Sequence, residues 1–349
     1  MTKAKIKNIW NLIWKNALRF IFNVGYSFIF PMIFGMENVL PSVALCVGLT
    51  MLPYSDLNIK PHVMATIIIG LNLGCGLVSQ LAFASPWIAL PVNLLFCALL
   101  LILTCEPTLT KPSISFLLCF IFCQANPVPV EKLPMRMLSL LAGSVITAVT
   151  MIFVWRHKEF GKDGRTFIEQ IKHCAVHYSY ILRMSIGLSA AMFIGSYFHL
   201  MKPLWISVVV MSLTQMNVNE TIERIKLRTV GTVIGAVVFV VIFGFIIPEK
   251  YSVIAVLVMG YLSFFTSDYK HKTIVNAVSA INASLVLMDT SRAINNRVIC
   301  LASGIGIVLV MWAIQHIAGF IIKNVNSEQK ICRKNKNVPN TTDAILKTS

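Results

Sequence analysis

The sequence contains few charged residues, and acidic residues are the scarcest of them. Asp, Glu, Lys and Arg make up 13% of the 349 residues, about half of their usual share in a soluble domain, whereas hydrophobic residues make up 56%. The apolar residues form runs of about 15–22, a length that crosses a hydrocarbon layer about 30 Å thick. The composition therefore excludes a soluble globular domain and predicts an integral membrane protein.

Carboxylates are nearly missing from the apolar runs, and the motifs of several enzyme classes do not occur. Glu37, Asp268 and Asp289 stand at the edges of these runs, so the sequence does not identify a group that couples transport to protons. No Walker A pattern, GxxxxGK[ST], occurs, which excludes ATP hydrolysis by that route. We therefore expect a protein that is not an enzyme and that needs no cofactor.

The cysteine and histidine patterns predict neither a disulfide framework nor a metal site. The nine cysteines are scattered singly, without a CxxC pair. Glu169, His173 and His177 would share one face of a helix, but no second cluster of ligands stands nearby in the sequence. A solvated helix face beside the membrane is the preferred interpretation, and we expect no metal ion.

The apolar runs predict an all-α protein, a polytopic helix bundle with about twelve transmembrane spans. The predicted spans are 18–36, 38–52, 63–82, 86–104, 113–127, 138–155, 181–199, 203–217, 230–248, 251–266, 274–288 and 298–320. Several of them are short or interrupted by proline, and ten to twelve crossings agree with the pattern.

Basic residues are distributed unevenly between alternate loops. With the N-terminus in the cytoplasm, 24 of the 30 Lys and Arg fall on the cytoplasmic side and 6 on the outer side. This bias predicts a multi-pass protein of a bacterial inner (cytoplasmic) membrane with both termini in the cytoplasm. The net charge of +16 arises from these loops, so the lipid bilayer, and no nucleic acid, is the expected partner.

Similar segments recur in the same order, which predicts two related halves. Residues 16–19 recur as 180–183, 164 positions later, and Arg136 recurs as Arg297, 161 positions later, each arginine seven residues before a glycine. An even number of spans in each half predicts parallel repeats. We predict a first six-span repeat over 1–155, a basic cytoplasmic linker over 156–180, a second six-span repeat over 181–322 and a disordered basic cytoplasmic tail over 323–349.

The densest group of polar and small residues in an apolar context lies early in the second predicted half. Trp205 stands in a short apolar run, Thr221–Arg224 forms a charged turn, and Arg228–Gly235 reads Arg-Thr-Val-Gly-Thr-Val-Ile-Gly. Gly231 and Gly235 fall on one face of a helix and predict the close packing of another helix.

These residues resemble the hallmark of the fusaric acid resistance-like (FUSC) and aromatic acid exporter families of inner-membrane proteins. The repeated six-span layout extends the resemblance over about residues 10–320. The first half departs from the pattern, since Lys60 and Ala65-Thr66 stand where Arg and Gly-Thr are expected. The chain has only a short basic linker where many members carry a large cytoplasmic domain, so it resembles a compact branch.

The resemblance implies efflux of small organic anions, typically aromatic carboxylic acids or related toxic compounds, from the cytoplasm. It also implies, for Gram-negative members, cooperation with a periplasmic membrane-fusion protein. We expect a homo-oligomer, for which a dimer and a trimer both remain open.

The chemistry of carboxylate recognition selects candidate binding residues. An aromatic carboxylate needs a cation, which arginine supplies through two parallel hydrogen bonds, and an apolar or aromatic wall for its ring. Arg228 is the first candidate because the motif contains it. Polar groups inside spans usually face a cavity or another helix, and prolines after Asn126 favour local unwinding there. The candidate substrate-binding residues are Arg228, Arg183, Thr232, Gln124, Asn126 and Trp205.

Three other functions remain open. A passive organic-anion channel is the first, because no intramembrane carboxylate for uphill transport is evident. A membrane-embedded enzyme would need a cluster of His, Asp or Glu at one membrane face, and the sequence shows only dispersed ones. A scaffold subunit without transport of its own is the third.

Overall fold

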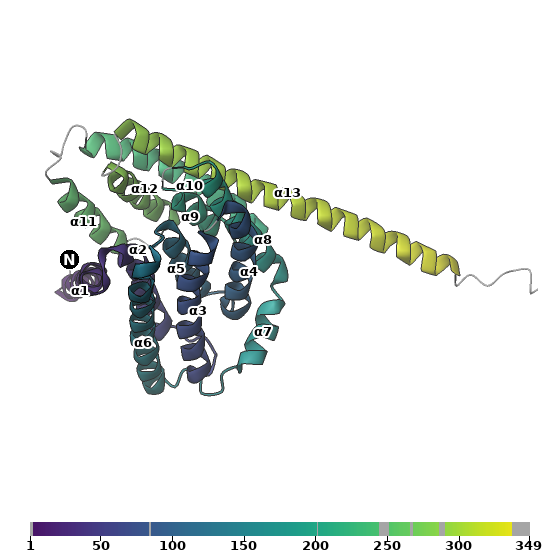
Figure 1. The fold of residues 1–349 in the computed structure, drawn as a ribbon, viewed down its shortest axis with the longest axis horizontal. Helices are drawn as coiled ribbons and strands as arrows, with labels where there is room; N and C mark the ends of the chain where they lie inside the picture. Colours follow the sequence, from purple (N-terminus) through teal and green to yellow (C-terminus); the bar gives the residue numbers. More distant parts are fainter. Residues whose placement is uncertain are drawn as a thin grey trace, which may run out of the picture. The chain divides into compact units, whose positions relative to one another are not determined.

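The computed structural model describes residues 3–83, 85–200, 202–243, 251–265, 268–285 and 290–336 (Figure 1). All extended regular elements in these residues are helices, and one isolated β-bridge joins Ile59 and Arg165. The all-α prediction is therefore confirmed. The chain divides into two compact units, residues 1–307 and residues 308–349.

The helices cover the predicted spans, but several extend well beyond them, and Thr221–Arg224, predicted as a charged turn, is helical. They are α1 (Lys3–Phe34), α2 (Val39–Met51), α3 (Pro61–Ala82), α4 (Pro86–Thr104), α5 (Ser113–Ala125), α6 (Leu133–Lys158), α7 (Phe167–Ala175), α8 (Tyr178–Tyr197), α9 (Leu204–Leu213), α10 (Val218–Val241), α11 (Ser252–Leu262), α12 (Tyr269–Leu285) and α13 (Thr290–Lys336). Short 3₁₀ turns are η1 (Met36–Asn38), η2 (Leu52–Tyr54), η3 (Val130–Lys132) and η6 (Ser263–Phe265). Each predicted span overlaps one helix, and α7 falls inside the predicted linker.

Within the described residues, six helical stretches are long and apolar enough to cross a membrane. They are Ile9–Phe34, Met36–Tyr54, Pro61–Ala82, Pro86–Thr104, Val130–Lys158 and Arg292–Ile317. Shorter apolar helices cover Ser113–Ala125, Leu204–Leu213 and Val253–Phe265. These helices identify a membrane protein, whereas the arrangement of twelve spans in two repeats stays a prediction.

Proline and polar residues set several helix boundaries. Helices α3, α4 and α6 each carry proline in their first turn, where the missing N–H is not needed. Helix α5 ends at Ala125, just before the Asn126-Pro127 pair. Helix α9 ends at Leu213, and residues 214–217 leave the helical path before α10 begins. Two short apolar helices thus end in non-helical segments.

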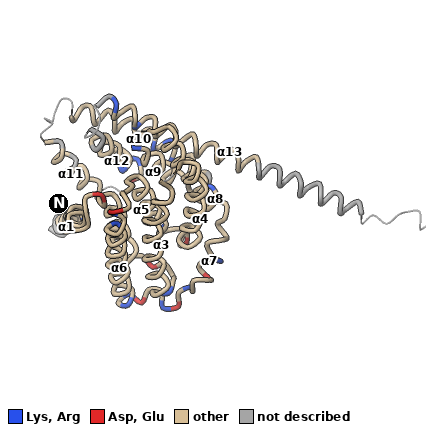
Figure 2. Tube along the Cα trace, viewed as in Figure 1, with Lys and Arg blue, Asp and Glu red and all other residues tan. Residues whose placement is uncertain are grey.

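Several helices carry their charged residues near their ends (Figure 2). Helix α6 illustrates this, with Arg136 in its first turns, Arg156 and Lys158 in its last turn, and only uncharged residues between them. This distribution leaves an uncharged stretch of a length suited to the hydrocarbon layer.

Small residues allow the helices of the first half to pack closely. A Cβ atom added to Gly76 of α3 would lie 2.6 Å from a methyl carbon of Leu140 in α6. A Cβ added to Gly143 of α6 would lie 2.6 Å from a methyl carbon of Leu45 in α2. Glycine at both positions therefore lets α6 lie close to α2 and α3 without displacing these leucine side chains.

Helices α10 and α12 pack through the two motif glycines. A Cβ added to Gly231 would lie 2.9 Å from Thr273, and one added to Gly235 would lie 2.6 Å from the Cβ atom of Ala277. These separations are shorter than real carbon contacts, so the glycines let the two helices approach closely. This packing places the polar face of α12 beside Arg228 of α10.

The predicted linker over 156–180 is folded against the α2–α3 connection. Arg165 donates hydrogen bonds to the carbonyl oxygens of Asn58 at 3.2 Å and Leu57 at 3.0 Å. Helix α7 then begins with a capping box, in which Thr166 and Glu169 exchange hydrogen bonds. The hydrogen bonds from Thr166 hold the pKa of Glu169 below its ordinary value.

The C-terminal part of the chain is described only in part. Helix α13 continues through residues 323–336, the first part of the predicted tail. Residues 337–349, and Asp289 among the carboxylates discussed above, lie outside the described residues.

Candidate functional site

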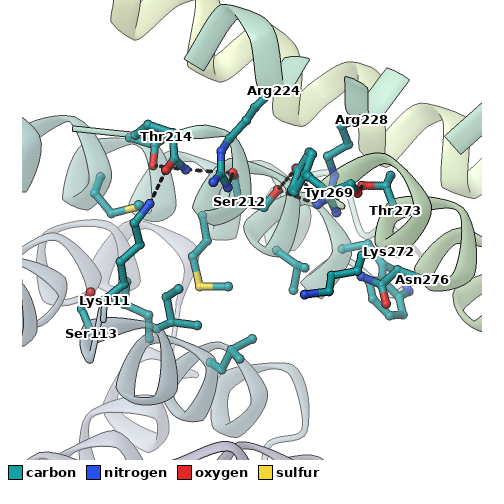
Figure 3. A pocket seen from close by; sticks show the side chains of 18 of the residues that line it. Lys111, Ser113, Ser212, Thr214, Arg224, Arg228, Tyr269, Lys272, Thr273 and Asn276 are labelled. Atoms are coloured by element: carbon teal, nitrogen blue, oxygen red, sulfur yellow. Dashed lines mark hydrogen bonds between the residues drawn. The ribbon is translucent and has the colours of Figure 1, made fainter. Parts of the chain in front are cut away.

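A cavity of about 840 Å³ lies between α5, α8, α9, α10, α12 and the start of α13 (Figure 3). Its size falls in the range of sites that enclose small organic ligands. The non-helical segment after α9 forms part of the wall. Irregular backbone is tolerated at membrane depth where it lines a cavity or is buried in protein, and this segment satisfies that condition.

Five cationic side chains line this cavity, and no carboxylate among the described residues does. The cationic residues are Lys111, Arg224, Arg228, Lys272 and Arg297. They come from the α4–α5 connection, α10, α12 and α13, so the fold gathers cations from distant parts of the sequence. Such a concentration of one sign creates a positive potential that attracts anions.

One polar network holds the segment after α9. Lys111 Nζ donates to Gln215 Oε1 at 2.5 Å, and Arg183 donates to the carbonyl oxygens of Gln215 and Met216 at 3.2 and 3.0 Å. Burial lowers the pKa of the Lys111 ammonium below its ordinary value, and repulsion from Arg224 lowers it further, whereas Glu220 opposes this. Arg183 therefore fixes the backbone of the cavity wall, and Lys111 presents a charge at its edge.

A second network surrounds Arg228. Its Nη1 atom donates to Ser212 Oγ at 2.5 Å and lies 3.5 Å from the hydroxyl oxygen of Tyr269. The guanidinium of Arg224, one helical turn earlier, lies 4.8 Å from the centre of the Tyr269 ring. Figure 3 shows Arg228, Ser212 and Tyr269 converging from three helices. The Nε atom of Arg228 has no hydrogen-bond partner among the described residues, so a donor remains for a ligand.

The far end of the cavity contains Trp205 and Arg297. The Arg297 guanidinium lies 4.6 Å from the centre of the Trp205 ring. Much of the remaining wall is apolar. The apolar lining residues include Ile114, Leu117, Leu118, Phe122, Met184, Val208 and Met211. Methionine adapts to ligands of different shape, so the wall suits a range of apolar bodies.

The structure brings together some of the predicted site residues and separates others. Arg228 and Trp205 line the cavity. Arg183 holds the cavity wall, and Thr232 is buried one turn beyond Arg228, with its hydroxyl unpartnered among the described residues. Gln124 instead faces a space of only about 40 Å³.

Asn126 lies in a different network. Its amide nitrogen donates to the carbonyl oxygen of Glu37, and its own carbonyl oxygen accepts from Arg136 at 3.0 Å. The helix does end before Pro127, as the pattern predicts, but the freed backbone group binds Arg136 rather than facing the cavity. Asn126 thus serves helix packing in this structure.

Several lining residues were missed by the sequence analysis. Lys111, Lys272 and Tyr269 stand outside the motif, and nothing in their local sequence distinguishes them from ordinary loop residues. The predicted topology places Arg297 among the six basic residues of the outer side, at the end of a helix. The one signal that points to it is the repeat, which pairs it with Arg136. Arg224 belongs to the motif but is not among the predicted substrate-binding residues.

A second cavity and a cluster of possible metal ligands also bear on ligand binding. A second cavity of about 830 Å³ is lined by Arg19, Phe22, Asn23 and Tyr54 among others, with Arg19 as its single cation and that residue exposed. Within the described residues, no group of three or more His, Cys, Asp or Glu is arranged to hold a metal ion. His177 of the helix-face pattern instead pairs with Glu106, with 2.5 Å between Nε2 and Oε1.

These features define a multi-helix membrane protein with an interior cavity lined by cations. Residues 190–311 match the family described as fusaric acid resistance protein-like, and this confirms the family resemblance over the segment that contains α9, α10 and α12. The chain is similar to the uncharacterized protein YhfK of Escherichia coli (strain K12), with 38% identity over 82 residues. That similarity spans 24% of this chain and only 12% of YhfK. No solved structure matches the chain.

Proposed function

We propose that the protein exports small organic anions, chiefly aromatic carboxylic acids and related toxic compounds, across a bacterial inner membrane. The observation that carries this proposal is the cavity lined by five cations and an apolar wall, with no carboxylate among the described lining residues. A carboxylate with an apolar ring matches both halves of this lining. The family resemblance supports transport rather than enzymatic chemistry.

The contacts between loops agree with the proposed topology. Lys60 bonds to Arg165 between two loops predicted in the cytoplasm, and Lys111 bonds to Gln215 on that same predicted side. On the predicted outer side, Asn126 bonds to Glu37. If both termini are cytoplasmic, Lys111 and Arg224 mark the cytoplasmic mouth, from which a substrate would enter.

A passive organic-anion channel is the second candidate. The same lining favours it, because no carboxylate of the described residues is placed to take up a coupling proton at the cavity. Both functions predict anion selectivity, and they differ only in the need for energy.

The test is the accumulation of labelled benzoate in cells with and without the protein, with and without a protonophore. Export requires that the protein lowers steady-state accumulation below its equilibrium level and that the protonophore abolishes this effect. Arg228→Ala should abolish it as well, because it removes the charge between Ser212 and Tyr269. Lys226→Ala, an exposed position on the same helix, is the matched control and should retain transport.

Accumulation that only equilibrates faster, without an energy requirement, would establish the channel. If the protein changes neither rate nor level for any aromatic carboxylate, the proposed substrate class is wrong. The proposed homo-oligomer and a periplasmic membrane-fusion partner rest on the family resemblance. Cross-linking in intact cells tests both.

A further inference from the structure

Arg297 is a buried cation whose hydrogen-bonding capacity is partly unused. Its exposed fraction is 5%, and its Nε and Nη1 atoms have no hydrogen-bond partner among the described residues. The indole nitrogen of the neighbouring Trp205 also has no hydrogen-bond partner among the described residues. Both residues line the cavity. Three donor nitrogens of this corner therefore have no acceptor among the described residues.

The corresponding arginine of the first half has the opposite character. Arg136 is equally buried, but its Nε atom donates to Asn38 Oδ1 at 2.5 Å. Its Nη2 atom donates to the carbonyl oxygens of Glu37 at 2.9 Å and Asn126 at 3.0 Å. Arg136 thus ties the start of α2 to the end of α5 and has a structural role.

The packing around the two arginines supports their pairing. Gly143, seven residues after Arg136, lies against Leu45 of α2, and Gly304, seven residues after Arg297, lies against Val209 of α9. Leu45 and Val209 are 164 positions apart, the same separation as the recurring segments 16–19 and 180–183. Two arginines in matching surroundings therefore differ in their hydrogen bonds, which points to different roles.

Buried donors without partners are rare, because each one loses its hydrogen bonds to water without replacement. A carboxylate supplies the missing acceptors, and its negative charge offsets the buried positive charge of the guanidinium. We propose that Arg297, oriented by Trp205, binds the carboxylate of the transported anion. This assignment rests on the proposed function of the cavity.

The rest of the anion would extend along α9. Ser212 follows Trp205 by seven residues, so the Arg228–Ser212 network lies about 10 Å further along the helix at 1.5 Å per residue. The apolar side chains of Val208 and Met211 line the space between them. An aromatic ring fits this interval, with its carboxylate at Arg297 and polar ring substituents toward Arg228.

The experiment measures equilibrium binding of labelled benzoate to the purified full-length protein in nanodiscs of phosphatidylethanolamine and phosphatidylglycerol. Benzamide, which has the same ring without the charge, serves as the competitor that should fail. We expect Arg297→Gln to weaken benzoate binding about 10- to 100-fold, the usual effect of losing hydrogen bonds to a charged group. Arg297→Lys should fall between this variant and the wild type.

Arg292→Gln is the matched control, because it removes a positive charge from an exposed position on the same helix. It should bind benzoate with the wild-type affinity. Trp205 is a positioning residue, because its ring orients the Arg297 guanidinium. Trp205→Phe keeps an aromatic ring and should retain most of the benzoate affinity, whereas Trp205→Leu should not. Benzoate should also change the tryptophan emission of the wild type, and Trp205→Phe should abolish that change.

The possible failures can be told apart. If Arg297→Gln binds benzoate as the wild type does, or if benzoate leaves the Trp205 emission unchanged while it binds, the assignment of Arg297 is wrong and the proposed function survives. If the wild type binds no benzoate, the proposed substrate class fails, and the assignment fails with it.

Discussion

The two paired arginines should affect stability very differently when each is replaced by methionine, an unbranched apolar residue that is shorter than arginine and uncharged. Arg136→Met leaves Asn38 Oδ1 and the carbonyl oxygens of Glu37 and Asn126 without their donor. A buried acceptor that loses its donor costs about 1–3 kcal/mol, and two of these three bonds are only partly buried. We therefore expect a loss of about 3–5 kcal/mol.

Arg297→Met should behave differently because no hydrogen bond from Nε or Nη1 to a described residue is lost. Replacing buried ionic groups with apolar ones of similar volume often stabilises proteins by about 1–4 kcal/mol. The lost contact with the Trp205 ring opposes this by about 1–2 kcal/mol. The expected free energy of unfolding therefore lies between about 1 kcal/mol below and about 3 kcal/mol above that of the wild type. The two variants should thus differ by at least about 2 kcal/mol.

Thermal unfolding of the purified variants, followed by intrinsic fluorescence in one detergent without ligand, gives the order of the midpoints. Arg136→Met should have the lowest midpoint, and Arg297→Met should lie close to the wild type or above it. An Arg297→Met midpoint as low as that of Arg136→Met would refute the reasoning, because it would show that Arg297 holds the fold together.

Two further predictions concern packing and charge. Gly235→Leu should destabilise the protein by about 1–3 kcal/mol, because the new Cβ atom would overlap α12. Gly25→Leu is the control and should not destabilise it, because nothing lies within 4 Å of a Cβ atom at that position. Thermal unfolding in detergent measures both variants. Benzoate affinity should fall as the pH rises through the lowered pKa of Lys111, since the charge of Lys111 adds to the positive potential that attracts the anion and is lost at a lower pH than for an ordinary lysine. Lys111→Arg keeps its charge, so in equilibrium dialysis it should bind benzoate equally well across that pH range. If its benzoate affinity declines with pH as that of the wild type does, Lys111 contributes no charge to the site.

The helices could be predicted from the sequence because membrane spans follow from local composition. Long apolar runs, prolines at helix starts and basic residues in the gaps are all local signals, and each predicted span overlaps a helix of the structure. The close approach of α10 to another helix was also predictable from Gly231 and Gly235. The identity of that helix, α12, was not, because nothing in either segment specifies its partner.

The site could be predicted only where a motif marked it. Arg228 and Trp205 lie in the cavity, because the motif that contains them is a local pattern. Lys111 and Lys272 stand 161 positions apart and meet only in the folded chain, so no local pattern connects them. Gln124 lies at a separate small space rather than in this cavity, since unwinding near a proline does not indicate which neighbour fills the gap.

The cavity explains why unpartnered donors persist in a membrane protein, where burial of charge costs most. Arg297 and Arg228 are both nearly buried and close enough to repel each other, and each has at least one donor nitrogen without a partner in the described residues. A fold selected for stability alone would satisfy such groups, as it does at Arg136. An anion bound in the cavity, as proposed, would relieve both the repulsion and the missing hydrogen bonds, so part of its binding free energy would come from groups that the protein itself leaves unsatisfied.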